Sequence, residues 1–284
     1  MYFAMAKYNK QLQVKEIIKC GKDPNYFFKN YLKIQHPVRG LISFDTYPFQ
    51  DDCVEEFLEH RFNIILKSRQ LGLSTLVAAY AVWMAIFQKE KNILIIATKL
   101  TVAQNFITKV KTMIRALPKW LLLPEIVENN KQKIRFSHGS EIKAVPTSED
   151  AGRSEALSLL IVDEAAFIRN FDELWTSLYP TISTGGRAIV LSTPNGVGGQ
   201  YHDIWLKAES GENEFEDIIL QAQGFGGAEF QALSLKETLS RVEEDLISKA
   251  LEQSDGNVSR CAKLLRIQRT TLIERIKKLN IKTA

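Results

Sequence analysis

Apolar and amphipathic segments alternate along most of the first 220 residues. Continuous apolar runs, each long enough for one buried strand, occur at 62–66, 92–97, 157–162 and 187–192. Segments with helical spacing lie between and beside them, at 74–88, 101–117 and near 171–178. Strands that are apolar throughout and alternate with helices are typical of a mainly parallel sheet covered on both faces. The pattern therefore predicts an α/β fold.

The same pattern divides the chain into parts. Residues 1–60 are predicted to form short helices and turns, and 133–136 and 141–145 to form a hairpin around the turn HGS. Near 221–229 the sequence becomes rich in glycine, which is typical of a linker. Everything after it has helical periodicity. We expect a domain over 1–220 that includes the 1–60 lead-in, a linker over 221–232, and a helical domain over 233–284.

Composition excludes several classes of protein. Of the 284 residues, 45% are hydrophobic and 25% are charged, as in ordinary globular domains. The longest apolar run has about a dozen residues, fewer than the ~20 that span a membrane, so no membrane association is expected. The three cysteines are scattered, which favours reduced thiols and a cytoplasmic location.

The first candidate site is the segment KSRQLGLST (67–75), between an apolar strand and an apolar helix. In a phosphate-binding loop of the form G-x-x-x-x-G-K-[ST], backbone N–H groups cradle phosphates, the lysine meets their oxygens and the hydroxyl binds Mg²⁺. Aligning Gly72 with the second glycine places Ser74 at the hydroxyl position and Leu73 where the lysine should be. Lys67 at the start of the loop can reach the same phosphates, and Arg69 adds a second cation. Taken alone, this match is equally compatible with a structural loop.

Two further segments follow predicted strands. LLIVDEAAF (159–167) ends its apolar run in Asp163 and Glu164, at the sheet edge where open α/β folds bind ligands. There Asp163 would hold Mg²⁺ through water, and Glu164 would orient and deprotonate an attacking water. LSTPNG (191–196) follows another apolar strand and could sense a γ-phosphate, although the local sequence favours an ordinary turn.

The segment TYPFQ (46–50) precedes the first strand. It contains an aromatic ring and an amide that could stack on and hydrogen-bond adenine. Core packing is an equally good explanation for Tyr47 and Phe49.

Together these segments resemble the ATPase half of the large terminase subunit of tailed bacteriophages, over roughly residues 17–215. The resemblance lies in CGKDPNYFFKNYLKIQHPVRGLISF (20–44), YPFQ (47–50), SRQLGLST (68–75), LPKWLLLPEIVENNKQKIRFSHGSEIKAV (117–145), LLIVDEAAFI (159–168) and STPNGVGGQYHDIW (192–205). It implies a P-loop NTPase core of the additional-strand type, ATP with Mg²⁺ as cofactors, and translocation on double-stranded DNA. Some members carry a P-loop whose lysine lies at the start of the loop, which fits Lys67.

The resemblance also implies roles for individual residues. The catalytic residues would be Glu164, Lys67 and Arg69, and Ser74 and Asp163 would hold the metal. The nucleotide would be contacted by Ser68, Arg69, Gln70, Leu71, Gly72, Ser74, Thr75, the adenine-motif residues Tyr47 and Gln50, and the coupling-motif residues Ser192, Thr193 and Asn195. The implied partners are a phage portal protein, a small terminase subunit and further copies in a ring, inside a bacterial host cell. Terminase large subunits continue into a nuclease domain, whereas the segment after the match here is of another kind, so nuclease activity is not expected.

The C-terminal segment has a different character. Residues 256–284 contain eight Lys or Arg and one acid, an excess larger than the net charge of +4 of the whole chain. LSLKETLSRVEEDLISKALEQSDG (233–256) has the 3–4 spacing of a helix seam. Two short amphipathic helices separated by the turn 266–268 follow, which predicts a helix-turn-helix. The candidate DNA contacts are Arg260, Arg269, Thr270, Thr271, Arg275, Lys277 and Lys278.

GNVSRCAKLL (256–265) and RTTLIERIKKLNI (269–281) make this segment resemble the Fis-type DNA-binding domain of NtrC-like bacterial activators. The resemblance covers about 233–281 and implies dimerisation through its first helix. The leading hypothesis is a terminase-type ATPase joined to a DNA-binding module. One alternative is a transcription regulator with a vestigial nucleotide-binding part. However, the GAFTGA loop of NtrC-like activators is absent, and the loop at 67–75 lacks the glycine–lysine pair that their loops keep. Another is a phage assembly protein that binds nucleotide without hydrolysing it.

Overall fold

The computed structural model describes residues 2–147, 156–220, 247, 250–251, 254, 257–265 and 269–278, without the side chains of 2–9, 263–264, 273–274 and 277–278. The chain divides into two compact units, Met1–Phe230 and Gln231–Ala284. The expected linker at 221–232 lies outside the described residues. None of the helices in the described parts is both long and apolar enough to cross a bilayer.

The first unit is built on an eight-stranded sheet with the order β10-β3-β9-β8-β4-β7-β6-β5. All strands from β10 to β7 run parallel, and β6 and β5 are antiparallel additions at one edge. The strands are β3 (Phe62–Lys67), β4 (Asn92–Ala97), β5 (Ile126–Asn129), β6 (Lys133–Phe136), β7 (Glu141–Pro146), β8 (Leu159–Asp163), β9 (Arg187–Ser192) and β10 (Phe215–Leu220). β9 lies between β3 and β8, so an additional strand separates the candidate loop from the candidate acids. The predicted α/β class is confirmed.

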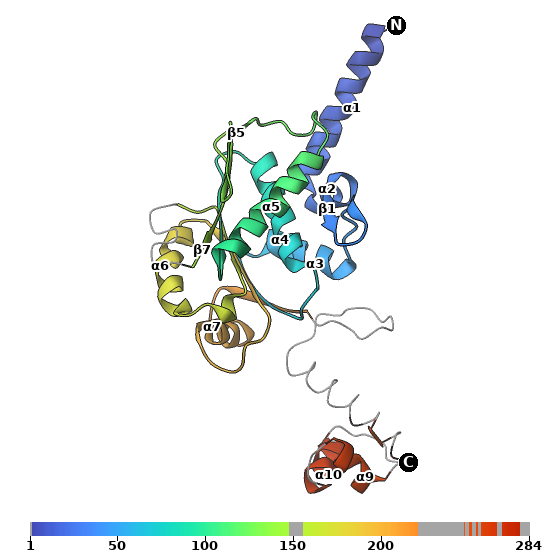
Figure 1. The fold of residues 1–284 in the computed structure, drawn as a ribbon, viewed down its shortest axis with the longest axis vertical. Coiled ribbons are helices and arrows are strands. Elements are labelled where there is room, and N and C mark those ends of the chain that lie inside the picture. The colour runs from blue at the N-terminus through green and yellow to red at the C-terminus, as the bar shows by residue number, and fades with distance from the viewer. Residues whose placement is uncertain are drawn as a thin grey trace. The chain divides into compact units, whose positions relative to one another are not determined.

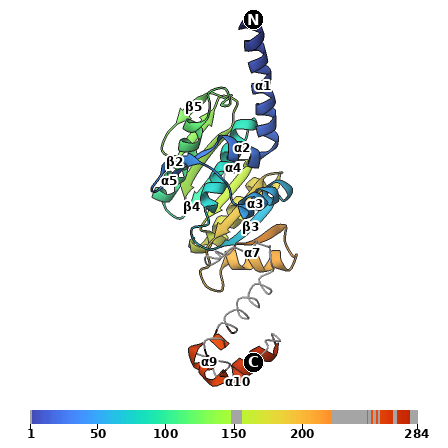
Figure 2. The same cartoon turned by 90° about the vertical axis from the view of Figure 1, so that its right-hand side faces the viewer.

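Helices cover both faces of this sheet (Figures 1 and 2). They are α1 (Tyr2–Lys22), α2 (Pro24–Tyr31), α3 (Pro48–Glu59), α4 (Leu73–Phe87), α5 (Leu100–Ala116), the 3-10 turn η1 (Ala165–Phe167), α6 (Phe171–Ser183) and α7 (Gln200–Glu209). Successive strand residues enter different cores: Ile95 packs with residues of α4 and α5, and Ile96 with residues of α6 and α7. Because the central strands are buried on both sides, they carry the continuous apolar runs seen in the sequence.

The prediction of only short helices and turns over residues 1–60 was wrong. α1 has 21 residues, and β1 (Lys33–His36) and β2 (Gly40–Ser43) form an antiparallel hairpin. Each hairpin strand has four residues and no fully buried position, so it produces no apolar run. β10 was missed for a related reason, since an edge strand with mostly half-buried residues can keep polar side chains.

The second unit contains α9 (Val258–Leu264) and α10 (Arg269–Lys278). The Asn257 side chain accepts hydrogen bonds from the N–H groups of Ser259 (3.0 Å) and Arg260 (3.2 Å), and so caps α9. The two helices share a small apolar core of Ile247, Ala250, Leu251, Val258, Cys261, Ala262, Leu265, Leu272 and Ile276. The two short amphipathic helices predicted here are confirmed, since each turns apolar residues into this core. The turn 266–268 and most of the seam at 233–256 lie outside the described residues.

The close approach of α6 to β9 gives a test of this packing. A Cβ at Gly186 would lie 2.4 Å from the Leu157 carbonyl oxygen and 2.9 Å from Ile182 Cα. We expect Gly186→Ala to lower the free energy of unfolding by about 1–3 kcal/mol, because backbone must move to admit the methyl group. Urea titration followed by tryptophan fluorescence reports on this unit alone, since the four tryptophans are Trp83, Trp120, Trp175 and Trp205.

Gly21→Ala is the matched control, because its added Cβ would meet only Phe87, at 3.4 Å. Alanine is the better helix former, so this variant should be neutral or slightly stabilised. Equal stabilities of the two variants would contradict the tight packing at Gly186.

Candidate functional site

Parallel pairing brings three functional segments to one sheet edge. Leu66 pairs with Ser192 across β3 and β9, and Asp163 pairs with Leu191 across β8 and β9. The carboxyl ends of the three strands therefore lie in register. Lys67 ends β3, and the chain continues from each strand end into a loop on the same side of the sheet. This is the edge at which open α/β sheets bind ligands.

The loop after β3 turns directly into α4. Gly72 takes a left-handed conformation (φ 73°) as the N-cap residue, and its carbonyl accepts from the N–H groups of Thr75 and Leu76. The N–H groups of the first helical turn and the positive end of the helix dipole therefore face the loop, an arrangement that favours anions. Leu73, at the usual lysine position, is 1% exposed and packs in the core. A phosphate-directed lysine has to come from elsewhere.

Lys67 and Glu164 form an ion pair across this edge, with 2.8 Å between Nζ and Oε1. The other carboxylate oxygen of Glu164 accepts from the N–H and the hydroxyl of Thr193, both at 3.1 Å. Burial tends to raise the pKa of Glu164, but the hydrogen bonds from Lys67 and Thr193 and the lysine charge outweigh it and leave the pKa lowered. Glu164 also has a left-handed backbone (φ 56°), which costs about 1 kcal/mol for a residue with a side chain. The fold thus holds an ionised carboxylate in a strained, fixed position.

Ser74 and Asp163 form the second pair, with 2.8 Å between the serine hydroxyl and Oδ2. Asp163 is 6% exposed, and its Oδ1 is buried with no hydrogen-bond partner among the residues that the structure describes. Burial raises the pKa of Asp163, although Ser74 and nearby lysines pull it down in part. A buried carboxylate oxygen without a donor, beside a serine hydroxyl, fits a hard cation such as Mg²⁺ with its bound water.

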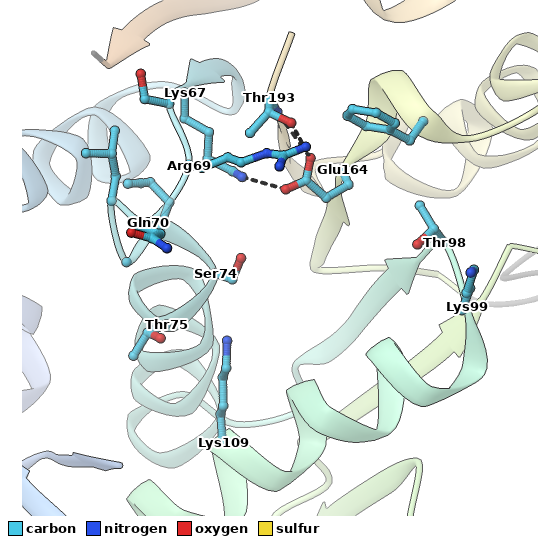
Figure 3. Close-up of a pocket in the computed structure, with 15 residues that line it drawn as sticks. Lys67, Arg69, Gln70, Ser74, Thr75, Thr98, Lys99, Lys109, Glu164 and Thr193 are labelled. Carbon is cyan, nitrogen blue, oxygen red and sulfur yellow. Dashed lines mark hydrogen bonds and ion pairs between the residues drawn. The ribbon is translucent and has the colours of Figure 1, made fainter. Parts of the chain in front are cut away.

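A cavity of about 660 Å³ opens above these two pairs. Figure 3 shows side chains from the loop after β3, from the segments after β8 and β9, and from α5 around this cavity. The lining residues are Lys67, Ser68, Arg69, Gln70, Leu71, Gly72, Leu73, Ser74, Thr75, Thr98, Lys99, Lys109, Glu164, Phe167 and Thr193. Among the lining residues that the structure describes, four are Lys or Arg and one, Glu164, is acidic, so this part of the cavity favours an anion with several charges.

The predicted adenine segment lies beside a second cavity of about 720 Å³, which shares Gln70, Leu71, Gly72 and Thr75 with the first. Tyr47 is 64% exposed and stacks on Phe49 at 5.7 Å between ring centroids. Gln50 is buried: it accepts from the Tyr47 N–H at 3.1 Å and donates to the Leu71 carbonyl at 2.9 Å. Its amide therefore joins the start of α3 to the phosphate loop.

The three predicted residues of the coupling motif surround the segment after β8. Ser192 is fully buried and accepts from the Ala166 N–H at 3.1 Å, while Asn195 donates to the Ala166 carbonyl at 2.8 Å. Of the three, Thr193 lines the cavity. Ser192 and Asn195 instead contact the backbone of Ala166, two residues after Glu164.

The predicted DNA-binding residues lie in the second unit. Arg260, Arg269, Thr270 and Arg275 are exposed, and Thr271 is half-buried. The side chains of Lys277 and Lys278 lie outside the described residues. The exposed residues at 269, 270 and 275 belong to α10, the helix predicted to enter the major groove.

Five described residues of the cavity lining were not predicted from the sequence: Leu73, Thr98, Lys99, Lys109 and Phe167. Thr98 and Lys99 directly follow β4, so their position at a strand end was a usable signal. Lys109 lies in the middle of α5, where no local pattern marks it.

The fold and site define a P-loop domain of the additional-strand class, followed by a helical unit. The family model "Terminase large subunit, T4likevirus-type, N-terminal" matches residues 64–250, and the chain belongs to this family. The model "Bacterial regulatory protein, Fis family" matches residues 238–279. Both resemblances are confirmed. The terminase match covers most of the first unit, so it favours the terminase hypothesis over a transcription regulator whose nucleotide-binding part is vestigial. The segment before residue 64, with the adenine motif, lies outside the matched part.

Two solved structures share the fold. The large terminase of bacteriophage HK97 is 17% identical over 77% of this chain and 46% of that chain, with a TM-score of 0.55. A mutant of the large terminase ATPase domain of Thermus phage P74-26 is 19% identical over 63% of this chain and 82% of that chain, with a TM-score of 0.51. The chain thus matches less than half the length of the HK97 protein.

The two adjacent acids should have opposite effects on stability. The lowered pKa of Glu164 means that its charge stabilises the fold above its unfolded pKa of about 4.3, and that this is lost as the pH falls through the folded value. Glu164→Gln should therefore cost about 1–3 kcal/mol at pH 7, the cost of a buried cation that loses its partner. The raised pKa of Asp163 reverses the sign, so Asp163→Asn should be more stable than wild type at pH 7.

Urea unfolding followed by tryptophan fluorescence at pH 7 and at lower pH checks both signs. The Asp163→Asn difference should shrink first, as the pH falls through the raised pKa of that carboxyl. The Glu164→Gln difference should begin to shrink only below about 4.3 and should disappear as the pH falls through the lowered pKa of Glu164. Two variants that shift in the same direction at pH 7 would contradict the assigned electrostatics.

Proposed function

We propose that the first unit binds ATP with Mg²⁺ and hydrolyses it to move double-stranded DNA, and that the second unit binds DNA. The observation that carries this proposal is the pair of contacts Lys67–Glu164 and Ser74–Asp163 at the start of α4, beneath a cavity rich in cations. A polyphosphate needs positive charge and helix N–H groups, and hydrolysis needs a carboxylate beside the terminal phosphate. Membership of the terminase family supports the same reaction.

Lys67 would take the place of the usual P-loop lysine. Its stem leaves the end of β3, and the ammonium group already lies at the cavity, bonded to Glu164. A terminal phosphate carries more negative charge than one carboxylate, so it would draw Lys67 away from Glu164. Arg69 lines the same cavity, and in Figure 3 its side chain extends toward Glu164. It would add a second positive charge there.

Release of Lys67 would free one oxygen of Glu164 to accept a hydrogen bond from the attacking water. Thr193 would still hold the other oxygen through its N–H and hydroxyl, which keeps the carboxylate aimed. The Lys67–Glu164 ion pair would therefore keep Glu164 from accepting a proton from water until a phosphate binds. A bound Mg²⁺ would neutralise charge that develops on the phosphate oxygens, and Ser74 and Asp163 would hold it.

The adenine end of the nucleotide would occupy the second cavity, beside Tyr47 and Gln50. Gln50 is bonded to the Leu71 carbonyl, so a change at the base would reach the phosphate loop through one side chain. Ser192 and Asn195 would couple to hydrolysis through the backbone of Ala166, next to Glu164.

The second unit would dock α10 in the major groove, with Arg269, Thr270, Thr271 and Arg275 toward the bases. Arg260, Lys277 and Lys278 would contact phosphate. Its match to a Fis family model supports this role. We further propose that 1–220 and 233–284 act as separate domains joined by 221–232, with dimerisation through the seam at 233–256. We also propose that the ATPase units form a ring with portal and small-subunit partners inside an infected bacterial cell, a proposal that membership of the terminase family supports.

The catalytic assignment is tested by ATP turnover of the full chain with Mg²⁺. Lys67→Ala should lower turnover by a factor of about 10² or more, the usual effect of removing a group that stabilises transition-state charge. Glu164→Gln should still bind ATP but nearly stop hydrolysis. Glu173→Gln, the same change at an exposed acid of α6, is the control and should behave like wild type. Normal turnover in both site variants would overturn the assignment.

The DNA-binding role is tested by gel-shift titration of the full chain at several salt concentrations. Arg269→Ala or Arg275→Ala should weaken binding to the preferred sequence by about 1–3 kcal/mol, with a smaller loss on random DNA, if these arginines reach base edges. Lys15→Ala removes the same charge from an exposed site in α1 and is the control. Affinity and sequence preference that match the control in both arginine variants would exclude base reading by α10.

A further inference from the structure

Lys109 is a second lysine at the phosphate cavity, and no motif accounts for it. It comes from the middle of α5, a helix whose buried side chains Ala103, Phe106, Ile107, Val110, Met113 and Ile114 pack in the core. Figure 3 shows the Lys109 side chain extending from α5 toward Ser74. It therefore approaches the cavity from α5, whereas Lys67 comes from the end of β3.

The charge of Lys109 has no partner in the part of the chain that the structure describes. Lys67, by contrast, is neutralised by Glu164 at 2.8 Å. The nearby Asp163 accepts its hydrogen bond from Ser74 rather than from Lys109. The Lys109 side chain is exposed at the cavity, where the atoms around it lower its pKa by desolvation while the charge of Asp163 works against this. Because no described carboxylate pairs with Lys109, its ammonium group can bind an anion that enters the cavity.

The other lysine in the same stretch of α5 behaves differently. Lys111 donates to the Asn130 carbonyl at 2.7 Å and lies outside the cavity lining. Lys111 is thus used locally, by the loop between β5 and β6. The two lysines are two residues apart on one helix, so they form a matched pair for experiment.

We propose that Lys109 binds the polyphosphate chain directly, from the α5 side of the cavity and next to the Ser74–Asp163 pair. Lys67 would then serve the terminal phosphate beside Glu164, and Lys109 the phosphate oxygens nearest the metal. Together they would replace the single lysine that Leu73 cannot supply, because Leu73 packs in the core. This assignment rests on the proposed function of the cavity, but it concerns any polyphosphate and not hydrolysis itself.

The test compares Lys109→Met, Lys109→Arg and the control Lys111→Met in the full chain. Binding of ATP and of inorganic tripolyphosphate, both with Mg²⁺, is measured by titration calorimetry. Lys109→Met should weaken both ligands by about 10- to 100-fold, the effect of losing a hydrogen bond to a charged group. Lys109→Arg should recover a large part of this loss, and Lys111→Met should bind as wild type does.

A purely structural role would give a different result. Lys109→Met would then lower stability in urea while leaving the affinity of the folded protein unchanged. We expect stability close to that of wild type, because the Lys109 side chain is exposed. Unchanged tripolyphosphate affinity in Lys109→Met would overturn the assignment, as would an absence of tripolyphosphate binding by wild type. A wild-type protein that binds tripolyphosphate through Lys109 but does not hydrolyse ATP would instead overturn only the proposed function.

Discussion

The register of three parallel strands is the constraint on which the site depends. Because β9 lies between β3 and β8, the ends of all three strands meet at one edge, and Lys67, Asp163 and Ser192 start their loops side by side. A shift of one residue in any strand would turn its end residue to the opposite face of the sheet. The apolar interior that fixes this register on both faces of the sheet is therefore also what sets the distances among the charged groups.

Charge in the cavity is arranged so that one sign is in excess. The two acids at the end of β8 have opposite roles: Glu164 is held ionised by Lys67 and Thr193, and Asp163 is disfavoured as an anion by burial. The remaining cations, Arg69, Lys99 and Lys109, add positive charge to the lining. A polyphosphate with Mg²⁺ would complement both the lysines and Asp163, because its anionic oxygens would contact the lysines and its cation would contact Asp163. The strain of the left-handed Glu164 is the kind of local cost found at functional sites.

The second unit follows simpler rules. In its described residues, two short helices pack on a small core in which Cys261 is fully buried and Leu272 packs from α10. With the apolar positions turned inward, Arg269 and Arg275 are left exposed on the same short helix. The combination of this unit with a terminase-type domain gives one chain two separate means of contacting DNA in the proposed function.

The sequence by itself determined the four central strands of the sheet, the helices α4, α5 and α6, and the place of the loop between β3 and α4. Buried parallel strands need continuous apolar residues, and these runs predicted β3, β4, β8 and β9 with little error. Asp163 and Glu164 were visible because they end such a run. The hairpin of β1 and β2 and the edge strand β10 were not visible, since half-buried strands tolerate polar residues.

Only the tertiary structure decided which charges meet. The Lys67–Glu164 contact joins residues 97 positions apart, and Lys109 reaches the cavity from a helix with no motif. The bond between Gln50 and Leu71 likewise depends on how α3 packs beside the loop. Local periodicity shows which face of an element is buried, but not which distant side chain lies across from it. That is set by the order of the strands in the sheet, which long-range packing determines.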